Sequence, residues 1–277
     1  MSEELFDIRS VSLGAGVQSS TMYILAAVGE LTPKPDVAIF ADTQAEPRWV
    51  YQHLDWLEAN FGGAVPICRV SAGSLEEATL RSRDGKTRKV SLPLRVMGKE
   101  GKAVFLRRQC TREYKIDPIK RELRRMLGLQ PRQRAFGRYR VEEWIGISRD
   151  EAHRAKPSRI PWITTRWPLL FDKPMRRAEC IDWLLRNGFE VPQKSACVFC
   201  PFHDDRTWQD LKQNHPEEFA RAVEFDRELR KGTLIGVRQT PYLHRELRPL
   251  DEIDFGTDTS NQLEIDFGNE CEGMCGV

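Results

Sequence analysis

The stretch IRSVSLGAGVQSS, residues 8–20, decides the fold class. Ile8–Leu13 alternates and contains β-branched residues, which predicts a strand. The small residues of Gly14–Ser20 predict a tight turn, and a helical pattern follows to about Val28. Such a turn lets backbone N–H groups approach an anion, and the helix dipole favours negative charge there. The turn lacks the Gly-Lys-Ser/Thr of a Walker A loop, so it predicts either a phosphate site of another kind or a tight connection without a ligand.

Further strands and helices follow in alternation. Val37–Ala41 is a continuous apolar run, as in a strand buried on both faces of a parallel sheet. Strands are also predicted at Pro66–Val70 and Val141–Ile147. Helices are predicted from Pro47 to Phe61 and over Ile116–Leu127, Pro174–Asn187, Asp205–Asn214 and Pro216–Arg230. The order predicts an α/β fold with a doubly wound, mostly parallel sheet and a small helical, cysteine-bearing C-terminal part.

Charge is unevenly distributed along the 277 residues, although the net charge is only +2. Between Arg81 and Arg140 there are 20 Lys or Arg against 5 Asp or Glu, whereas from Asp251 onward there are 8 acids and no Lys or Arg. The basic segment indicates a polyanionic partner, such as a nucleic acid or a nucleotide, or else a solvated face. Within it, residues 81–108 are expected to form an excursion or a hairpin. The domains are therefore expected at 1–195, with this insertion, and at 196–277, which ends in an acidic tail.

The apolar runs are too short to span a bilayer, and the N-terminus Met-Ser-Glu-Glu lacks the pattern of a signal peptide. We therefore expect no membrane contact and a cytoplasmic location. A composition of 40% hydrophobic and 30% charged residues excludes a wholly disordered chain.

Two carboxylates follow the second strand, Asp42 and Glu46. Ligands of open parallel sheets bind at the carboxyl ends of the strands, so this pair is a candidate for a nucleotide or Mg²⁺ site. The alternative is a helix-capping Asp and a solvated Glu.

Seven cysteines in such a chain are not expected to form disulfides. Cys197 and Cys200 form a Cys-x-x-Cys pair, which suits a zinc ion, a redox disulfide or an iron–sulfur cluster. Cys110 lies among arginines that would lower a thiol pKa. Cys271 and Cys275 near the C-terminus can complete a metal site, act as redox thiols or do neither. Core positions are expected for Cys68 and Cys180, and a capping or surface role, rather than a ligand role, for His203.

These segments, taken in order, resemble the PP-loop ATP pyrophosphatases, and specifically their phosphoadenosine phosphosulfate (PAPS) reductase-like branch. The resemblance covers about residues 8–201. Five segments carry it. The family's loop Ser-Gly-Gly-x-Asp-Ser corresponds to Gly14-Ala15-Gly16-Val17-Gln18-Ser19 of this chain, and its Asp-Thr-Gly-x-Glu motif corresponds to Asp42-Thr43-Gln44-Ala45-Glu46. The Cys-Cys-x-x-x-Lys-x-x-Pro motif of the cluster-containing reductases corresponds to Arg108-Gln109-Cys110-Thr111 with Lys115 and Pro118, the Gly-Ile-Arg-x-Asp-Glu motif to Gly146-Ile147-Ser148-Arg149-Asp150-Glu151 with Arg154, and the Glu-Cys-Gly motif in part to Glu270-Cys271.

The resemblance implies an adenine nucleotide alpha hydrolase-like fold of the PP-loop (HUP) type. It also implies cleavage of ATP to AMP and pyrophosphate, which activates a nucleic acid (DNA or tRNA) or a nucleotide for sulfur transfer. A sulfur donor such as a cysteine desulfurase is then an implied partner. The implied residues are Gly14, Ala15, Gly16, Gln18, Ser19 and Ser20 for the ATP phosphates, Asp42 and Glu46 for the nucleotide with Mg²⁺, Arg149 and Arg154 for phosphate, and Cys110, Cys197 and Cys200 for a [4Fe–4S] cluster with Cys275 or Cys271 at its fourth iron.

Two departures from the family pattern keep other functions open. Gln18 stands in place of the loop aspartate, and Gln109 in place of the first cysteine of the pair. The second hypothesis is a reductase of a sulfonucleotide (PAPS or APS), in which Cys271 or Cys275 attacks sulfur. The third is a non-enzymatic nucleic-acid-binding module with zinc held by Cys197, Cys200, Cys271 and Cys275.

Overall fold

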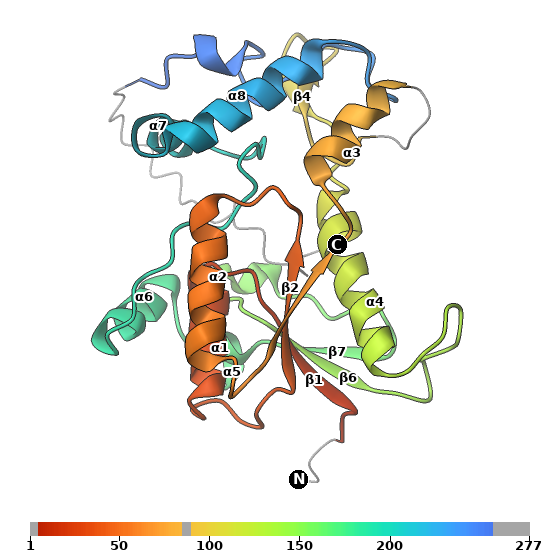
Figure 1. Cartoon of the computed structure of the whole chain (residues 1–277), viewed down its shortest axis with the longest axis vertical. Coiled ribbons are helices and arrows are strands. Elements are labelled where there is room, and N and C mark those ends of the chain that lie inside the picture. Colours follow the sequence, from red (N-terminus) through yellow and green to blue (C-terminus); the bar gives the residue numbers. More distant parts are fainter. Residues whose placement is uncertain (1–4, 85–89, 257–277) are drawn as a thin grey trace.

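A five-stranded parallel sheet forms the centre of the computed structural model, which describes residues 5–84 and 90–256. Its strand order is β3-β2-β1-β6-β7 (Figure 1). The strands are β1 (Ile8–Ser12), β2 (Val37–Asp42), β3 (Ile67–Ser71), β6 (Val141–Ile145) and β7 (Ile163–Arg166). The predicted α/β class with a parallel sheet is confirmed. Val37–Ala41 is buried throughout, as its unbroken apolar sequence predicts.

Helices cover both faces of this sheet, so it is doubly wound. On one face lie α1 (Val17–Ala27), α2 (Arg48–Phe61), α5 (Pro168–Phe171) and α6 (Arg177–Arg186), with Tyr23, Leu54, Trp144 and Leu184 in the core between them. On the other face lies α4 (Asp117–Met126), where Ile119 and Leu123 pack with Val37 and Ile39. The five residues before α4, Arg112–Ile116, form a π-helical turn.

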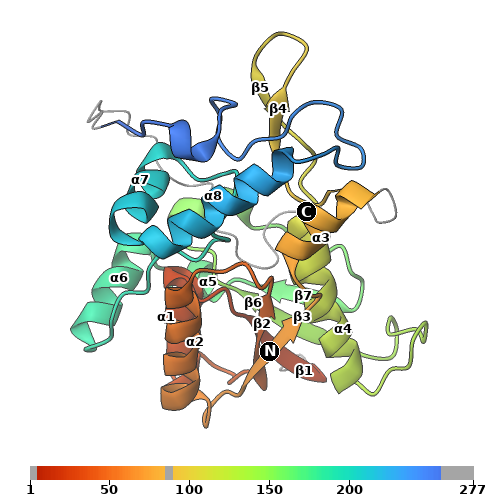
Figure 2. The same cartoon turned by 45° about the horizontal axis from the view of Figure 1, so that its top comes forward.

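A second layer lies beyond the carboxyl ends of the strands (Figures 1 and 2). It contains α3 (Leu75–Arg81), the antiparallel hairpin of β4 (Arg95–Met97) and β5 (Ala103–Phe105), α7 (Asp205–Asn214) and α8 (Pro216–Arg230). Its core joins Leu94 and Val96 to Phe199, Trp208 and Phe225. The hairpin expected within 81–108 is therefore present, and it shares one apolar core with the cysteine-bearing helical region.

Short 3-10 segments complete the described chain: η1 (Ser82–Asp84), η3 (Arg149–Arg154) and η4 (Leu250–Glu252). Within residues 5–84 and 90–256, no helix combines the length and the apolar character that crossing a bilayer requires. Cys271 and Cys275 lie outside the described residues, so the roles expected of them stay predictions.

Candidate functional site at the carboxyl ends of the strands

The sheet reverses its strand order between β1 and β6. The chain runs from β1 outward to β2 and β3, and β6 and β7 extend the sheet on the other side. Crevices at such a switch point are the usual ligand sites of open α/β sheets. A Cβ built on Gly146, just after β6, would lie 2.9 Å from both the Cα and the N of Ser19 in the first turn of α1. The two segments that resemble the family's phosphate-binding motifs therefore meet here, and only glycine fits at the contact.

The loop between β1 and α1 is held in a fixed conformation. Ala15 has a left-handed φ of 56°. Ser19 Oγ accepts hydrogen bonds from Gly14 N at 3.2 Å and from Gly16 N at 3.3 Å. The N-cap residue of α1, Gly16, has no side chain that could accept from the N–H groups of the helix, which begins at Val17, and the Ser19 hydroxyl accepts only from N–H groups that precede the helix. The first backbone N–H groups of this helix are therefore left for another acceptor, as an anion site requires.

Gln18 connects this loop to the segment after β6. Its buried Nε2 donates to Glu151 Oε2 at 3.3 Å and to Ser148 Oγ at 3.5 Å. Glu151 Oε1 in turn accepts from Arg154 at 2.5 Å. An aspartate at position 18 would place a second buried carboxylate against Glu151, whereas the glutamine amide donates to it. This contact explains why Gln18 is compatible with its neighbours.

The two arginines of the same segment are placed differently. Arg154 is largely buried and ion-paired to Glu151. Arg149 is exposed, and its side chain makes no hydrogen bond or ion pair with the residues that the structure describes. Arg149 is therefore the more available of the two for a phosphate, while Arg154 carries a charge already balanced by a carboxylate.

Asp42 and Glu46 have different environments at the end of β2. Asp42 Oδ1 accepts from Gln44 N at 2.7 Å and from Tyr51 Oη at 2.8 Å, and the side chain stays partly exposed. Burial and then Asp42 raise the pKa of Tyr51, so Tyr51 remains a donor that orients this carboxylate. Glu46 is 1% exposed and pairs with Lys115 Nζ at 3.3 Å. The alternative of a solvated Glu46 is therefore wrong.

Residues Lys194–Val198 cross over the ends of β1 and β2. Ser195 Oγ donates to Gly14 O at 2.6 Å, and Val198 N donates to Ala45 O at 2.8 Å. Cys197 Sγ lies 3.5 Å from Thr43 Oγ1. Burial, and next the nearby Glu46 carboxylate, raise the pKa of Cys197 well above its usual value, and Lys115 only partly opposes this. Without a metal the Cys197 thiol is therefore protonated, and it lies beside the carboxylate edge.

Cys200 shares a tight turn with Cys197, because Cys200 N donates to Cys197 O at 3.0 Å. Cys110 precedes Lys115 by five residues, a little over one turn of the same helix, and Lys115 contacts Glu46. Both Cys110 and Cys197 pack against the core of the second layer. In residues 5–84 and 90–256, no three His, Cys, Asp or Glu side chains converge on the position of a single metal ion.

The remaining residues singled out in the sequence have structural environments. His203 is buried and donates through Nε2 to Cys197 O at 3.0 Å, and burial lowers its pKa to about 4. It is therefore a neutral brace of the cysteine turn, and the surface role expected for it is wrong. Cys180 is fully buried in the core, and Cys68 is partly buried and donates to Glu122. The five cysteines within the described residues form no disulfide with one another.

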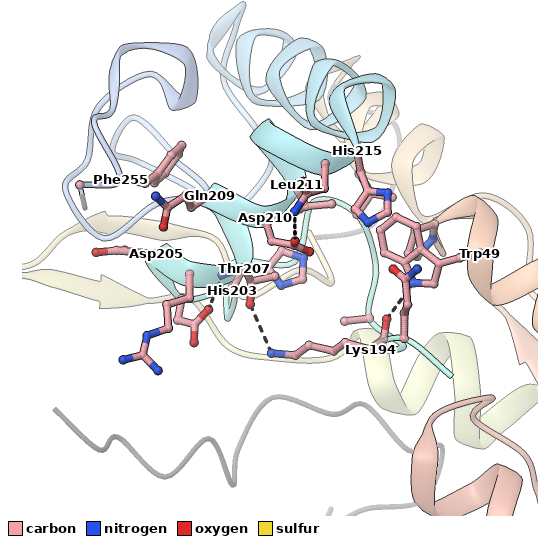
Figure 3. Close-up of a pocket in the computed structure, with 18 of the residues that line it drawn as sticks. Trp49, Lys194, His203, Asp205, Thr207, Gln209, Asp210, Leu211, His215 and Phe255 are labelled. Carbon is pink, nitrogen blue, oxygen red and sulfur yellow. Dashed lines mark hydrogen bonds between the residues drawn. The ribbon is translucent and has the colours of Figure 1, made fainter. Parts of the chain in front are cut away.

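Two cavities near this edge were not indicated by the sequence. One has a volume of about 750 Å³ and is lined by α7 and by the segment that precedes it (Figure 3). Ala196, Val198 and His203 line this cavity, and they belong to the segment that carries Cys197. The other, of about 270 Å³, lies beside the end of β6. Its charged lining residues are Arg112, Asp117, Lys120, Lys156 and Arg159. The lining of this second cavity thus carries an excess of cations.

The chain was compared with protein-family models, with curated proteins and with solved structures. No protein-family model matches it, and no curated protein matches it. Among solved structures, the chain is similar to the phosphoadenylyl-sulfate (PAPS) reductase from Candida auris, determined as a phosphate complex. The two share 14% sequence identity with a TM-score of 0.42, and the match covers 68% of this chain and 76% of the other.

Proposed function

We propose that this chain binds ATP at the carboxyl ends of β1 and β6 and cleaves it to AMP and pyrophosphate, thereby activating a second substrate. The observation that carries the proposal is the contact of Gly146 with Ser19, which brings the glycine-containing loop and the N-terminus of α1 against the segment that carries Arg149, at the switch point of the sheet. Backbone N–H groups and a helix dipole favour the charge of a phosphate chain.

In the proposed reaction, an oxygen of the second substrate attacks the α-phosphorus. The bond from that phosphorus to the bridging oxygen breaks, and pyrophosphate leaves with the electron pair. AMP is then attached to the substrate oxygen. It is released when a sulfur nucleophile bonds to the carbon that bears this oxygen and the carbon–oxygen bond breaks. The chain contributes position and charge neutralisation. The first N–H groups of α1 hold phosphate oxygens, and Arg149 approaches the leaving pyrophosphate. Asp42, oriented by Tyr51, suits Mg²⁺, which keeps waters and binds through one or two carboxylates together with the substrate phosphates.

Access to the loop requires a local movement. Gly14–Ser20 are buried, and Ser195 hydrogen-bonds to Gly14 O. Residues 194–198 must therefore shift before a triphosphate reaches the N-terminus of α1. This requirement links nucleotide binding to the segment that carries Cys197, and amide hydrogen exchange measures it directly. We expect ATP to slow exchange at 14–20 and to change it at 194–198.

We also propose that Cys197, Cys200 and Cys110 hold a [4Fe–4S] cluster. A cluster offers a separate iron to each thiolate, so its ligands need not converge on one point as they do for zinc. Two thiols on one turn and a third on the helix of Lys115 suit that requirement. When bound, such a group supplies an iron that accepts inorganic sulfide. The chain's own contribution is to keep Cys197 beside Thr43 and Glu46, close to the proposed nucleotide.

The test is incubation of the anaerobically purified protein with ATP and Mg²⁺, with and without nucleic acid, while AMP and pyrophosphate are measured. Arg149→Ala should reduce pyrophosphate release at least tenfold, since a charge-assisted contact contributes about 1.5–3 kcal/mol. Arg186→Ala, at an exposed arginine near the end of α6, is the matched control. No pyrophosphate under any condition refutes ATP cleavage, and sulfite formed from a sulfonucleotide establishes the reductase instead. Colourless protein with one zinc refutes the cluster.

A further inference from the structure

The β4–β5 hairpin has two different faces. Toward the body, Leu94 and Val96 are buried in the core of the second layer. On the other face, Arg95 lies opposite Phe105, and Met97 lies opposite Ala103. Met97 is 47% exposed and Phe105 is 40% exposed, although both are large apolar side chains. The hairpin projects from the body (Figure 2), and Met97 together with the exposed part of Phe105 remains accessible to a partner.

Stacked arginine and phenylalanine side chains pack this face of the hairpin against the residues that follow the Cys197–Cys200 turn. Arg95 lies over the ring of Phe105, 4.0 Å from its centroid, and the Phe105 and Phe202 ring centroids are 4.5 Å apart. Arg108 lies over Phe202 at 5.3 Å. Arg95 Nε also donates to Pro201 O at 3.3 Å. Because Phe202 follows Cys200 by two residues, a molecule bound on the hairpin lies next to the cysteine turn.

The charge of the hairpin is strongly positive. Residues 95–108 contain five Lys or Arg and one acid, Glu100. Lys99, Lys102 and Arg107 are exposed, and none forms an ion pair with the residues that the structure describes. Cations without acidic partners beside exposed apolar side chains fit a chain that carries both phosphates and flat hydrophobic rings.

We propose that the outer face of the β4–β5 hairpin binds single-stranded nucleic acid and directs it toward the Cys197–Cys200 turn. The cations contact the phosphates, and Met97 and the exposed part of the Phe105 ring contact unpaired bases. A duplex keeps its bases stacked inside and leaves these side chains without a partner. A nucleic acid bound here would be the second substrate of the reaction proposed above. This assignment of the substrate rests on the proposed function, whereas the binding itself does not.

The test is fluorescence anisotropy with a labelled oligonucleotide of about 15 nucleotides, as DNA and as RNA, without ATP. Its duplex form is the comparison. We expect the single strand to bind more tightly than the duplex. The variant Lys99→Ala with Lys102→Ala should weaken binding about tenfold and reduce the slope against salt by about 1.4. Phe105→Leu, which keeps apolar packing but removes the ring, should weaken binding about tenfold with little change in that slope.

Two variants serve as controls for charge and for ring removal. Lys34→Ala removes an exposed lysine in the connection before β2, and Phe171→Leu replaces a ring that is 74% exposed on α5. Neither should change affinity, and circular dichroism should show that every variant is folded at the assay temperature. Equal loss in the controls, tighter binding of the duplex, or no binding at low salt would overturn the proposal. Absence of binding at low salt would indicate that the exposed apolar side chains of the hairpin contact a protein partner instead. Because the binding assay contains no ATP, it tests the nucleic-acid surface independently of ATP cleavage. Failure of one proposal can therefore be distinguished from failure of the other.

Discussion

Gly146 and Ser19 lie so close that the strand β6 and the helix α1 have no space for a side chain between them. A Cβ on Gly146 would be 2.9 Å from two backbone atoms of Ser19, and backbone cannot rotate away as a flexible side chain can. Gly146→Ala should therefore displace the first turn of α1. We expect a loss of about 1–3 kcal/mol in the free energy of unfolding. ATP binding should fall below detection in calorimetry.

The matched control is Gly63→Ala. A Cβ at this glycine has nothing within 4 Å, and its φ is outside the left-handed region. Its stability and nucleotide affinity should stay close to those of the parent. Unchanged ATP affinity in Gly146→Ala would show that the first turn of α1 does not bind the phosphates.

Lys115 neutralises a carboxylate that has no access to water. Lys115 and Glu46 side chains are 6% and 0% exposed, and Glu46 Oε2 has no hydrogen-bond partner among the described residues. Lys115→Met keeps the volume but leaves Glu46 charged and buried, which should cost about 3 kcal/mol in urea unfolding. The double variant Lys115→Met with Glu46→Leu should recover most of that loss. If the double variant is no more stable than the single one, the pair does not act as a unit.

The proposed cluster predicts a separation between metal content and folding. Cys197→Ser should remove iron and acid-labile sulfide while the circular dichroism spectrum stays that of the parent, because the sheet and its helices form without Cys197. Cys68→Ser is the control, since Cys68 lies in a different core and donates to Glu122. Iron content equal to the parent in Cys197→Ser would exclude this thiol as a ligand.

The fold was predictable where the sequence pattern is local and continuous. Val37–Ala41 and the helices at 205–214 and 216–230 lie where their patterns predict them. The strand β7 was missed because Ile163–Arg166 is only four residues long and lies at the edge of the sheet, although its β-branched Ile-Thr-Thr sequence favours a strand. The helix α3 was also missed, although Ser74 caps it by accepting from Glu77 N, and the Ser-x-x-Glu spacing was a usable signal.

The site was less predictable, because its contacts join residues far apart in the chain. Gln18 meets Glu151 across 133 residues, and nothing local to either indicates the contact. A lone Glu46 is usually solvated, and only the helix that carries Lys115 shows why it is buried here. The 750 Å³ cavity beside α7 depends on how Lys194–Thr207 folds back, which has no periodic signal. The order of the motifs therefore predicted that the site lies at the carboxyl ends of the strands. It did not predict which residues pair there, such as Gln18 with Glu151 and Lys115 with Glu46.

Glu143 makes stability depend on pH. This residue lies within β6, is fully buried, and neither carboxylate oxygen has a hydrogen-bond partner in the described structure. Burial raises its pKa from 4.5 to about 8. The folded state therefore binds the proton more tightly than the unfolded state. Stability is highest below about pH 4.5 for this group and falls as the pH rises toward 8, by on the order of 3 kcal/mol at neutral pH.

Glu143→Gln keeps the shape of the protonated acid and cannot ionise. The variant should therefore be more stable than the parent at pH 8, and the difference should shrink as the pH falls toward 5. Urea unfolding at several pH values measures it, and Glu142→Gln on the same strand is the control for a partly exposed carboxylate paired with Arg166. Removing the Glu142 charge should lower stability at neutral pH instead of raising it. A constant difference between Glu143→Gln and the parent across this range would mean that Glu143 is already ionised in the fold, held by a cation or water that reaches it within β6.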